Sequence, residues 1–185
     1  EIGDDKVGGV IKSFMTENNL STEFLDINYD SKTAVALAFL DENNDAQYEF
    51  YKDYPNQKID SFFPKVEADD IVLFGSYYAV SPKLRPKMLD FLQMARDKNA
   101  LIYYDVNFRQ SHADEAVRLA PSLIENVEFA DIIRGSLDDF RHLYKTEDIE
   151  KIYKDKIRFY SPYFICTAAD KGIEVSCEDD VFWKK

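Results

Sequence analysis

Glycine is unusually scarce in this chain of 185 amino acids. There are six, at positions 3, 8, 9, 75, 135 and 172, well below the roughly 7% that proteins use on average. Neither a G-x-G-x-x-G fingerprint nor a G-x-x-x-x-G-K-[ST] loop can be written from these positions, so both common glycine-rich phosphate cradles are excluded. If the protein handles phosphates, it must do so by other means.

Cysteine and histidine are sparser still, with two residues of each. The two cysteines, Cys166 and Cys177, and the two histidines, His112 and His142, provide neither a disulfide framework nor the spacing of a four-ligand zinc site. We therefore expect reduced thiols in an intracellular compartment. No apolar run approaches the length needed to span a bilayer.

Positive charge is also in deficit. Lys and Arg number 23 against 35 Asp and Glu, which gives a formal net charge of -12. A field of that sign repels nucleic acid and anionic membranes unless a basic patch overrides it, and the sequence has no run of Lys or Arg that could do so. We expect neither nucleic acid nor a membrane as a partner.

The first third of the chain combines a helical pattern with an alternating one. Between residues 4 and 19 the apolar positions fall at i, i+3, i+4, i+7 and i+8, which predicts an amphipathic helix. Residues 33–40 and 47–52 alternate in polarity around the polar segment 41–45, which predicts a β-hairpin. Its half-polar character places the hairpin outside the buried centre of the protein.

From residue 70 onward, short apolar runs alternate with helical patterns. The predicted strands are 71–74, 100–104, 130–134, 163–167 and 173–176; the predicted helices begin at Ser81-Pro82 and run to residue 99, then cover 111–125, 138–144 and 147–156. Such an order calls for an α/β fold with a mostly parallel sheet covered on both faces. The hairpin becomes a small subdomain near the N-terminal end.

Ligands bind open α/β sheets outside the carboxyl ends of the strands, so the segments that follow the apolar runs are the candidate site. These segments are 75–78, 105–109, 134–139 and 167–172. They contain an acid suited to Mg²⁺, Asp139, and guanidinium groups suited to phosphate, Arg109 and Arg134. No hydrolytic triad is present, because neither histidine follows a strand and Cys166, inside an apolar run, is interpreted as a core thiol.

Six short stretches resemble, in order, the motifs of one enzyme family. They are Glu1-Ile2-Gly3-Asp4-Asp5-Lys6-Val7-Gly8, Phe50-Tyr51-Lys52, Phe74-Gly75-Ser76, Asp105-Val106-Asn107-Phe108-Arg109, Ser136-Leu137-Asp138-Asp139 and Thr167-Ala168-Ala169-Asp170-Lys171-Gly172. The chain resembles the ribokinase-like (PfkB) carbohydrate kinases, in the fructokinase and 2-keto-3-deoxygluconate kinase branch.

The resemblance implies a fold, an activity and an assembly. It implies a doubly wound, mostly parallel ribokinase-like domain over residues 1–185, incomplete at both ends, with a β-hairpin lid at about 31–60. The implied activity is ATP- and Mg²⁺-dependent phosphorylation of a sugar or sugar-acid hydroxyl by a cytoplasmic enzyme. The family's lids often pair, which implies a homodimer through the β-lid.

The resemblance also implies roles for individual residues. Phe50, Tyr51 and Lys52 match the lid positions that contact sugar, and Asn107 and Arg109 match positions near the substrate and the transferred phosphate. Ser136 and Asp139 match the N-x-x-E motif that organises phosphate and Mg²⁺, with both residue types changed. For the nucleotide, the implied set is Arg109, Ser136, Thr167, Lys171 and Gly172, with Asp139 for the metal.

Departures from the family leave alternatives open. The middle glycine of the T-x-G-x-x-G loop is Ala169, an unfavourable residue if that position requires a positive φ. Ser136 and Asp139 also spell a capping box, and Lys52 suits a solvated strand edge. The family's first sugar-binding strand and its G-A-G-D motif are not in this sequence, so no catalytic residue is assigned and we expect the chain to be part of a longer one. A non-catalytic sugar- or nucleotide-binding relative and a nucleoside kinase are the alternative functions.

Overall fold

The computed structural model describes residues 1–42, 46–52, 63–108, 115–177 and 180–184. The chain divides into two compact units, Glu1–Pro64 and Lys65–Lys185, and each is described by itself. The single domain over residues 1–185 stays a prediction. None of the described helices is both long enough and apolar enough to cross a membrane.

The first unit opens with a strand that the sequence pattern does not predict. Strand β1 (Ile2–Gly3) pairs in parallel with β2 (Ile27–Asn28), and helix α1 (Lys6–Glu17) lies between them in the chain. The predicted helix is confirmed. Its apolar residues Val10 and Phe14 are nevertheless exposed, whereas Ile11 and Met15 of the same stripe are half-buried.

A compact set of hydrogen bonds joins the start of α1 to the segment before the hairpin. Asp5 caps the helix: its Oδ1 accepts hydrogen bonds from the Gly8 amide (2.9 Å) and the Thr33 hydroxyl (2.9 Å), and its Oδ2 accepts one from the Thr33 amide (2.8 Å). The Gly3 amide donates to Thr33 Oγ1 (2.9 Å). These hydrogen bonds favour the carboxylate, with those from the Gly8 and Thr33 amides first, and lower the pKa of Asp5 to about 2.

The predicted β-hairpin is present. Strand β3 (Val35–Leu40) pairs antiparallel with β4 (Ala46–Tyr51) in a register that joins Val35 to Tyr51 and Leu40 to Ala46. Its aromatic side chains are exposed, and the rings of Tyr48 and Phe50 stack at 6.1 Å. The predicted lid boundary at residue 60 lies outside the described residues.

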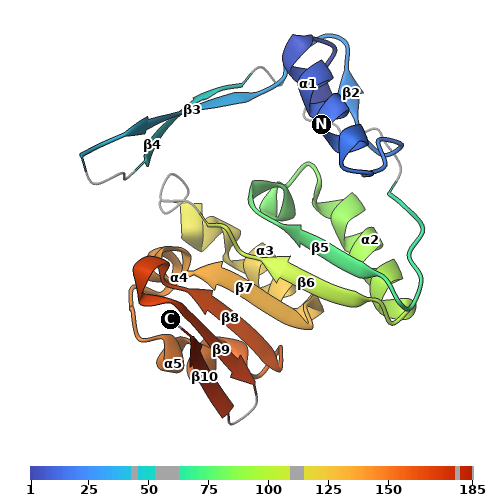
Figure 1. Ribbon diagram of the computed structural model, residues 1–185. Coiled ribbons are helices and arrows are strands. Elements are labelled where there is room, and N and C mark those ends of the chain that lie inside the picture. The colour runs from blue at the N-terminus through green and yellow to red at the C-terminus, as the bar shows by residue number, and fades with distance from the viewer. Residues whose placement is uncertain (43–45, 53–62, 109–114, 178–179, 185) are drawn as a thin grey trace. The chain divides into compact units, whose positions relative to one another are not determined.

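The second unit is built on a six-stranded sheet with the order β10-β9-β8-β7-β6-β5 (Figure 1). Strands β5 to β8 are parallel, whereas β9 and β10 are antiparallel to their neighbours. This arrangement confirms the predicted α/β fold with a mostly parallel sheet. The elements are β5 (Ile71–Gly75), the 3-10 turn Tyr77–Val80, α2 (Arg85–Asp97), β6 (Leu101–Asp105), α3 (Ala116–Phe129), β7 (Ile132–Ser136), α4 (Leu137–Tyr144), α5 (Ile149–Ile152), a π-helical turn (Tyr153–Ile157), β8 (Tyr163–Thr167), the 3-10 turn Ala169–Lys171, β9 (Ile173–Cys177) and β10 (Asp180–Lys184).

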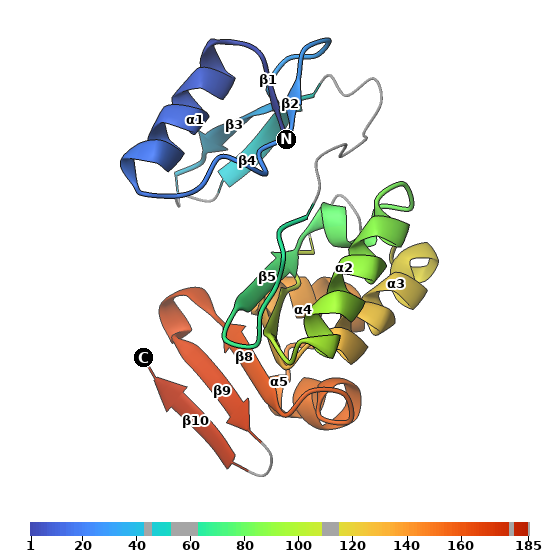
Figure 2. The ribbon, with the colours of Figure 1, turned by 90° about the vertical axis from the view of Figure 1, so that its right-hand side faces the viewer.

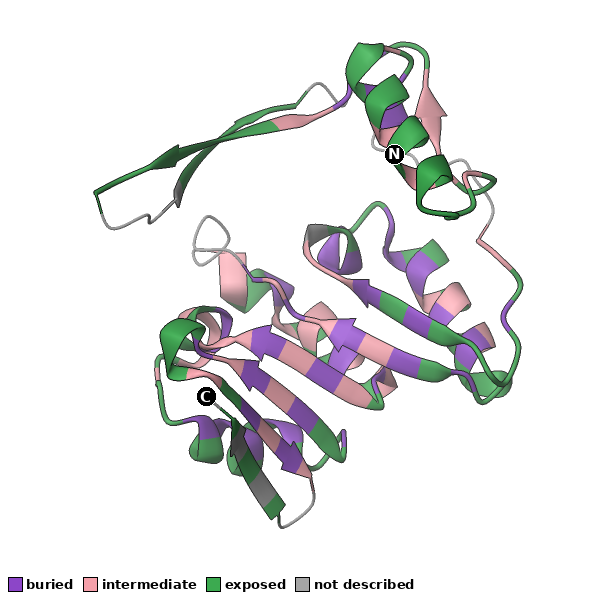
Figure 3. Ribbon diagram, viewed as in Figure 1, coloured by how far each residue is buried: buried purple, intermediate pink, exposed green. Residues whose placement is uncertain are grey.

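The core of this unit lies between the helices and one face of the sheet (Figure 2). Alternate strand residues on this face are buried, and their aromatic rings pack in pairs: Phe74 stacks on Tyr104 at 4.9 Å, and Phe140 of α4 meets Phe164 edge-on at 5.0 Å. Figure 3 shows buried and less buried residues alternating along the strands. The period of two is that of a sheet with one covered face.

The opposite face corrects the expectation of a sheet covered on both sides. Ile71 and Leu73 of β5 are each 67% exposed, and Tyr163 and Phe182 are also exposed. Along β5 and β8 the alternate residues, such as Val72 and Phe164, are buried. The described helices of this unit therefore cover one face of the sheet only. A continuous apolar run cannot reveal this, since it reads the same whether one or both faces are covered.

Several element boundaries differ from the sequence-based expectation, among them those of α2, α3 and β7, where β7 covers Ile132–Ser136 and not residues 130–134. Helix α2 begins at Arg85 with Pro86 in its first turn, because Ser81 is extended and its carbonyl accepts hydrogen bonds from the amides of Leu84 and Arg85. Helix α3 begins at Ala116 and continues to Phe129, four residues further than predicted, and its predicted start at residue 111 lies outside the described residues. Strand β10 was not predicted.

Candidate functional site

The carboxyl ends of the four parallel strands meet at one edge of the sheet. In register, Gly75 of β5 lies beside Asp105 of β6, Asp105 beside Arg134 of β7, and Ser136 beside Thr167 of β8. Nearer the strand starts, the same face has the apolar row Leu73, Tyr103, Ile132 and Tyr163. The change to polar side chains at the carboxyl edge marks the place where α/β sheets bind ligands.

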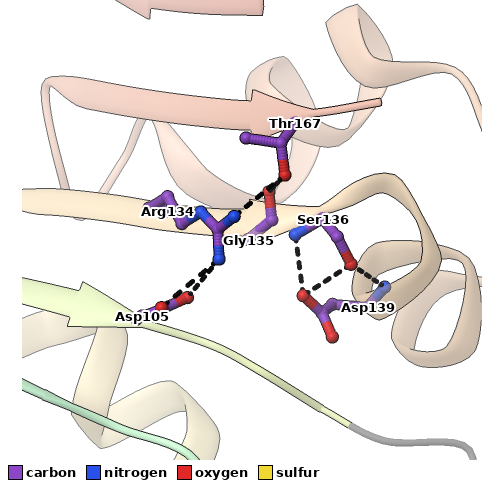
Figure 4. A network of polar contacts seen from close by, with 6 residues as sticks. All are labelled: Asp105, Arg134, Gly135, Ser136, Asp139 and Thr167. Carbon is purple, nitrogen blue, oxygen red and sulfur yellow. Dashed lines mark hydrogen bonds and ion pairs between the residues drawn. The ribbon is translucent and has the colours of Figure 1, made fainter. Parts of the chain in front are cut away.

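Ser136 and Asp139 form the capping box of helix α4 (Figure 4). Asp139 Oδ2 accepts hydrogen bonds from the Ser136 amide (2.7 Å) and hydroxyl (2.8 Å), and the Asp139 amide donates to Ser136 Oγ (3.1 Å). Asp139 is only 6% exposed. The structural alternative for these two residues is therefore confirmed, and the pair fixes the start of α4 at the carboxyl edge.

Arg134 joins three adjacent strands on the uncovered face (Figure 4). Its Nη1 donates to both carboxylate oxygens of Asp105, at 3.0 and 3.3 Å, and its Nη2 donates to Thr167 Oγ1 at 3.1 Å. The side chains of Arg134 and Asp105 are 32% and 35% exposed. The sequence identifies Arg134 as a guanidinium at a strand end, but it does not reveal these partners.

Backbone strain accumulates at the same edge. Ser76, Asn107 and Ala169 follow β5, β6 and β8 respectively and have φ values of 59°, 39° and 46°. Ser76 combines its φ with a ψ of -160°, a region that is almost reserved for glycine and costs about 1–3 kcal/mol. Strained residues of this kind cluster at functional sites. The sequence places Ser76 in a candidate segment but gives no sign of its backbone strain.

The loop after β8 contains the predicted nucleotide-binding residues. Ala169 does adopt a positive φ, which is the condition under which alanine was expected to be unfavourable. Lys171 is exposed in the 3-10 turn, and Gly172 has a φ of 106° that favours glycine. The Ala168 amide donates to the Gly172 carbonyl (2.8 Å), which closes the loop at its base.

The cysteines behave as expected for reduced thiols. Both are free, and Cys166 is fully buried on the core face of β8. Burial, with Glu174 and Asp139 nearby, raises the pKa of the Cys166 thiol to about 12. The interpretation of Cys166 as a core thiol is confirmed.

The remaining predicted site residues fall in both units. Asn107 is half-buried two residues beyond β6, whereas Arg109 lies outside the described residues. Phe50 and Tyr51 are exposed at the end of β4, and Lys52 Nζ lies 4.7 Å from the centroid of the Phe50 ring. The structure thus brings Ser136 together with Asp139, and Thr167 together with Arg134, while the binding roles themselves stay predictions.

A multidentate metal cage is not found in the part of the chain that the structure describes, where no three His, Cys, Asp or Glu residues are grouped to hold an ion. Asp139, the residue predicted to contact the metal, is a single buried carboxylate, and its metal role stays a prediction.

Known proteins resemble this chain in sequence and in fold. The chain is 21% identical to probable fructokinase-6, chloroplastic, of Arabidopsis thaliana over 85% of its own length and 44% of that protein's. It is 19% identical to fructokinase-1 of Oryza sativa subsp. japonica, over 97% and 57%. The chain therefore spans about half the length of the curated relatives that it matches.

Solved structures show the same fold. A fructokinase double mutant from Vibrio cholerae O395, bound to fructose, ADP and potassium, has a TM-score of 0.82 and 18% identity over all of this chain and 60% of that one. Aminoimidazole riboside kinase from Salmonella enterica, in complex with aminoimidazole riboside and an ATP analogue, has a TM-score of 0.74 and 18% identity over 99% and 60%. The family model described as pfkB family carbohydrate kinase matches residues 1–181. The chain belongs to the pfkB family of carbohydrate kinases.

Proposed function

We propose that this chain forms the middle part of a fructokinase-like sugar kinase, which transfers the γ-phosphoryl group of ATP to a hydroxyl of a sugar or sugar acid. The observation that carries the proposal is the polar carboxyl edge of the parallel sheet, in a chain that the pfkB family model matches over residues 1–181. Phosphoryl transfer depends mainly on positioning and charge stabilisation, which such an edge can supply.

On this proposal the nucleotide lies against the loop after β8. Thr167, Lys171 and Gly172 offer a hydroxyl, an exposed ammonium group and a backbone conformation that allows close approach. Asn107 and Arg109, which follow β6, lie near the acceptor sugar and the transferred phosphate. Ser136 adds a polar group at the N-terminus of α4, where the helix dipole favours anions.

The Mg²⁺ ion of the nucleotide would take Asp139 as its protein contact. One buried carboxylate fits an ion that keeps most of its bonds to phosphate and water. Asp139 Oδ2 accepts hydrogen bonds from the Ser136 amide and hydroxyl, so the capping box fixes the direction of the Asp139 carboxylate.

The hairpin would act as the lid over the sugar. Phe50 and Tyr51 present exposed aromatic surface, and Lys52 adds a positive charge beside it. Exposed aromatic side chains on both strands also support pairing of two lids in a homodimer, since solvated apolar surface of this kind favours association. The proposed setting is the cytoplasm.

An ADP-release assay with ATP and Mg²⁺ tests the activity against fructose, 2-keto-3-deoxygluconate, ribose and adenosine, and it is run on the longer protein of which this chain is proposed to be the middle part, because no catalytic residue is assigned in residues 1–185. Turnover with a sugar or sugar acid supports the proposal, whereas turnover with adenosine alone identifies a nucleoside kinase. Binding of sugar or ADP without any turnover identifies a non-catalytic relative. The absence of both turnover and binding would refute all three.

A pair of neighbouring acids gives a matched control for the metal contact. Asp139→Asn should weaken the Mg²⁺ dependence of nucleotide binding, because it removes the one buried carboxylate of the site. Asp138→Asn changes an exposed acid that pairs with Arg141 on the surface, and should leave that dependence unchanged. Equal effects of both substitutions would contradict the role of Asp139.

A further inference from the structure

Two ion-paired arginines of the second unit have very different surroundings. Arg85 is nearly buried: its Nε and Nη2 donate to Glu125 Oε2 (3.1 and 2.7 Å), and its Nη1 donates to the Ala79 carbonyl (2.8 Å) and to the amide oxygen of Asn126. Removing it would leave buried polar groups without partners, which is strongly destabilising. Arg85 is a structural arginine.

Arg134 is not of this kind. Its ion pair with Asp105 is about one-third exposed, and pairs that water reaches to this extent contribute little to stability. What distinguishes Arg134 is its position. Asp105 begins the segment that contains Asn107, and Thr167 begins the loop that contains Lys171 and Gly172. One guanidinium therefore connects the start of both proposed binding loops.

The charge of Arg134 is already balanced. Both Asp105 oxygens lie within 3.3 Å of its Nη1, so an approaching phosphate would meet a neutral pair and the carboxylate would repel it. A direct phosphate contact is therefore disfavoured, although Arg134 lies at the edge where phosphates are expected.

The contact with Thr167 has a direction. Arg134 can only donate, so Thr167 Oγ1 accepts at 3.1 Å and its own proton must point to another acceptor. Within the described residues that acceptor is the Gly135 carbonyl at 3.5 Å, the limit of a hydrogen bond. This hydrogen bond is thus weak, and the hydroxyl can rotate to donate instead to a better acceptor, such as an oxygen of a bound nucleotide.

We propose that Arg134 is a positioning residue for the nucleotide. It donates to Thr167 Oγ1, so that the Thr167 hydroxyl can donate its own proton in a hydrogen bond to the nucleotide, and its ion pair with Asp105 keeps the guanidinium in place. The proposal rests on the proposed function, because it assumes that the loop after β8 binds ATP or ADP. Arg134 acts through Thr167 and does not contact the nucleotide itself.

A double-mutant cycle tests this mechanism with the full chain, using calorimetric titration of ADP in the presence of Mg²⁺. Arg134→Met and Thr167→Val should each weaken ADP binding roughly fivefold to tenfold, the loss of one oriented hydrogen bond. The double variant should bind no more weakly than either single variant, because both changes remove the same interaction. Sugar affinity should change by less than twofold, and Arg134→Lys, which keeps a donor and the charge, should recover part of the loss.

Arg85→Met is the matched control. It should lower the melting temperature while leaving ADP affinity within twofold. Arg134→Met should leave the melting temperature nearly unchanged and weaken ADP binding. Should Arg134→Met fail to fold, as judged by circular dichroism, Arg134→Lys with and without Thr167→Val provides a cycle of the same design, in which a smaller but again non-additive loss of ADP affinity is expected because lysine keeps a donor.

The outcomes separate this inference from the proposed function. No ADP binding by the unmutated chain would overturn the proposed nucleotide site, and this inference with it. Binding by the unmutated chain that Arg134→Met leaves unchanged would overturn the inference alone. Additive losses in the double variant would also overturn it, because they would mean that Arg134 contacts the nucleotide directly.

Discussion

Replacing Gly75 by alanine tests the close approach of β5 and β6 on which the candidate site is built. Gly75 is the last residue of β5 and pairs with Asp105. A Cβ atom at Gly75 would lie 1.9 Å from the Asp105 carbonyl oxygen and 2.8 Å from the carbonyl carbon. Both atoms belong to the backbone of β6, so no side-chain rotation can relieve the overlap.

The expected loss in the free energy of unfolding follows from the shift that Gly75→Ala imposes on β5 and β6. The strand ends must separate by more than 1 Å to restore normal contact, and overpacking of this kind costs about 1–3 kcal/mol. The hydrogen bond from the Ser76 amide to the Asp105 carbonyl (3.2 Å) is then lost, at about 1 kcal/mol. The free energy of unfolding should fall by about 2–4 kcal/mol, and the melting temperature by roughly 5–15 °C.

Two further glycines calibrate the measurement. A Cβ at Gly9, in α1, meets no atom within 4 Å, so Gly9→Ala should stabilise by about 0.5–1 kcal/mol. A Cβ at Gly135 meets the buried ring of Phe140 at 2.6 and 2.8 Å, which predicts an intermediate loss because a side chain can shift more readily than a backbone. Urea unfolding followed by circular dichroism measures all three variants.

The refuting result is equally specific. A stability for Gly75→Ala within 0.5 kcal/mol of the unmutated chain would mean that β5 and β6 do not approach each other as described. Displacement of Asp105 should also weaken ADP binding, because Arg134 loses its anchor.

Three other predictions rest on single residues. Because the folded-state pKa of Asp5 is lowered from 3.8 to about 2, its contribution to stability is complete above pH 4 and is lost as the pH falls toward 2. Asp5→Asn should therefore flatten the decline in urea stability between pH 5 and pH 2; an unchanged decline would contradict the lowered pKa. Ala169→Gly should stabilise by about 0.5–1 kcal/mol, since it removes left-handed strain of about 1–2 kcal/mol at some cost in chain entropy, and a loss of stability would show that Ala169 is not strained. Cys166, with its pKa near 12, should resist a thiol-specific disulfide reagent at pH 8 in the folded Cys177→Ser variant and react on unfolding in urea; fast reaction in the folded protein would refute its burial.

The sequence predicts the central elements because their patterns are long and regular. The alternation in residues 35–40 and 46–51 yields β3 and β4, and the apolar runs after residue 70 yield β5 to β9. The pattern fails where an element is too short to show a period, as in the two-residue strands β1 and β2. It also fails for β10, although its antiparallel partner β9 is its neighbour in the chain.

In the candidate site, too, local features can be predicted from the sequence, whereas contacts between distant residues cannot. The capping box of Ser136 and Asp139 is a local motif that joins residues three positions apart, and the S-x-x-D spacing predicts it. The bridge from Asp105 through Arg134 to Thr167 joins residues about thirty positions apart. Only the register of β6, β7 and β8 brings them together, and no single sequence encodes that register in a readable form.

That register is itself set by the core. Along β7, Ile133 and Gly135 face the helices, and Arg134 and Ser136 lie on the opposite face. A slip of one residue would turn Arg134 into the core and Ile133 toward solvent, at the cost of burying a charge without its partners. The packing of Ile133 and Phe164 on one face therefore fixes the position of Arg134 on the other. A substitution that shifts this packing should weaken nucleotide binding even though it lies on the far side of the sheet from the candidate site.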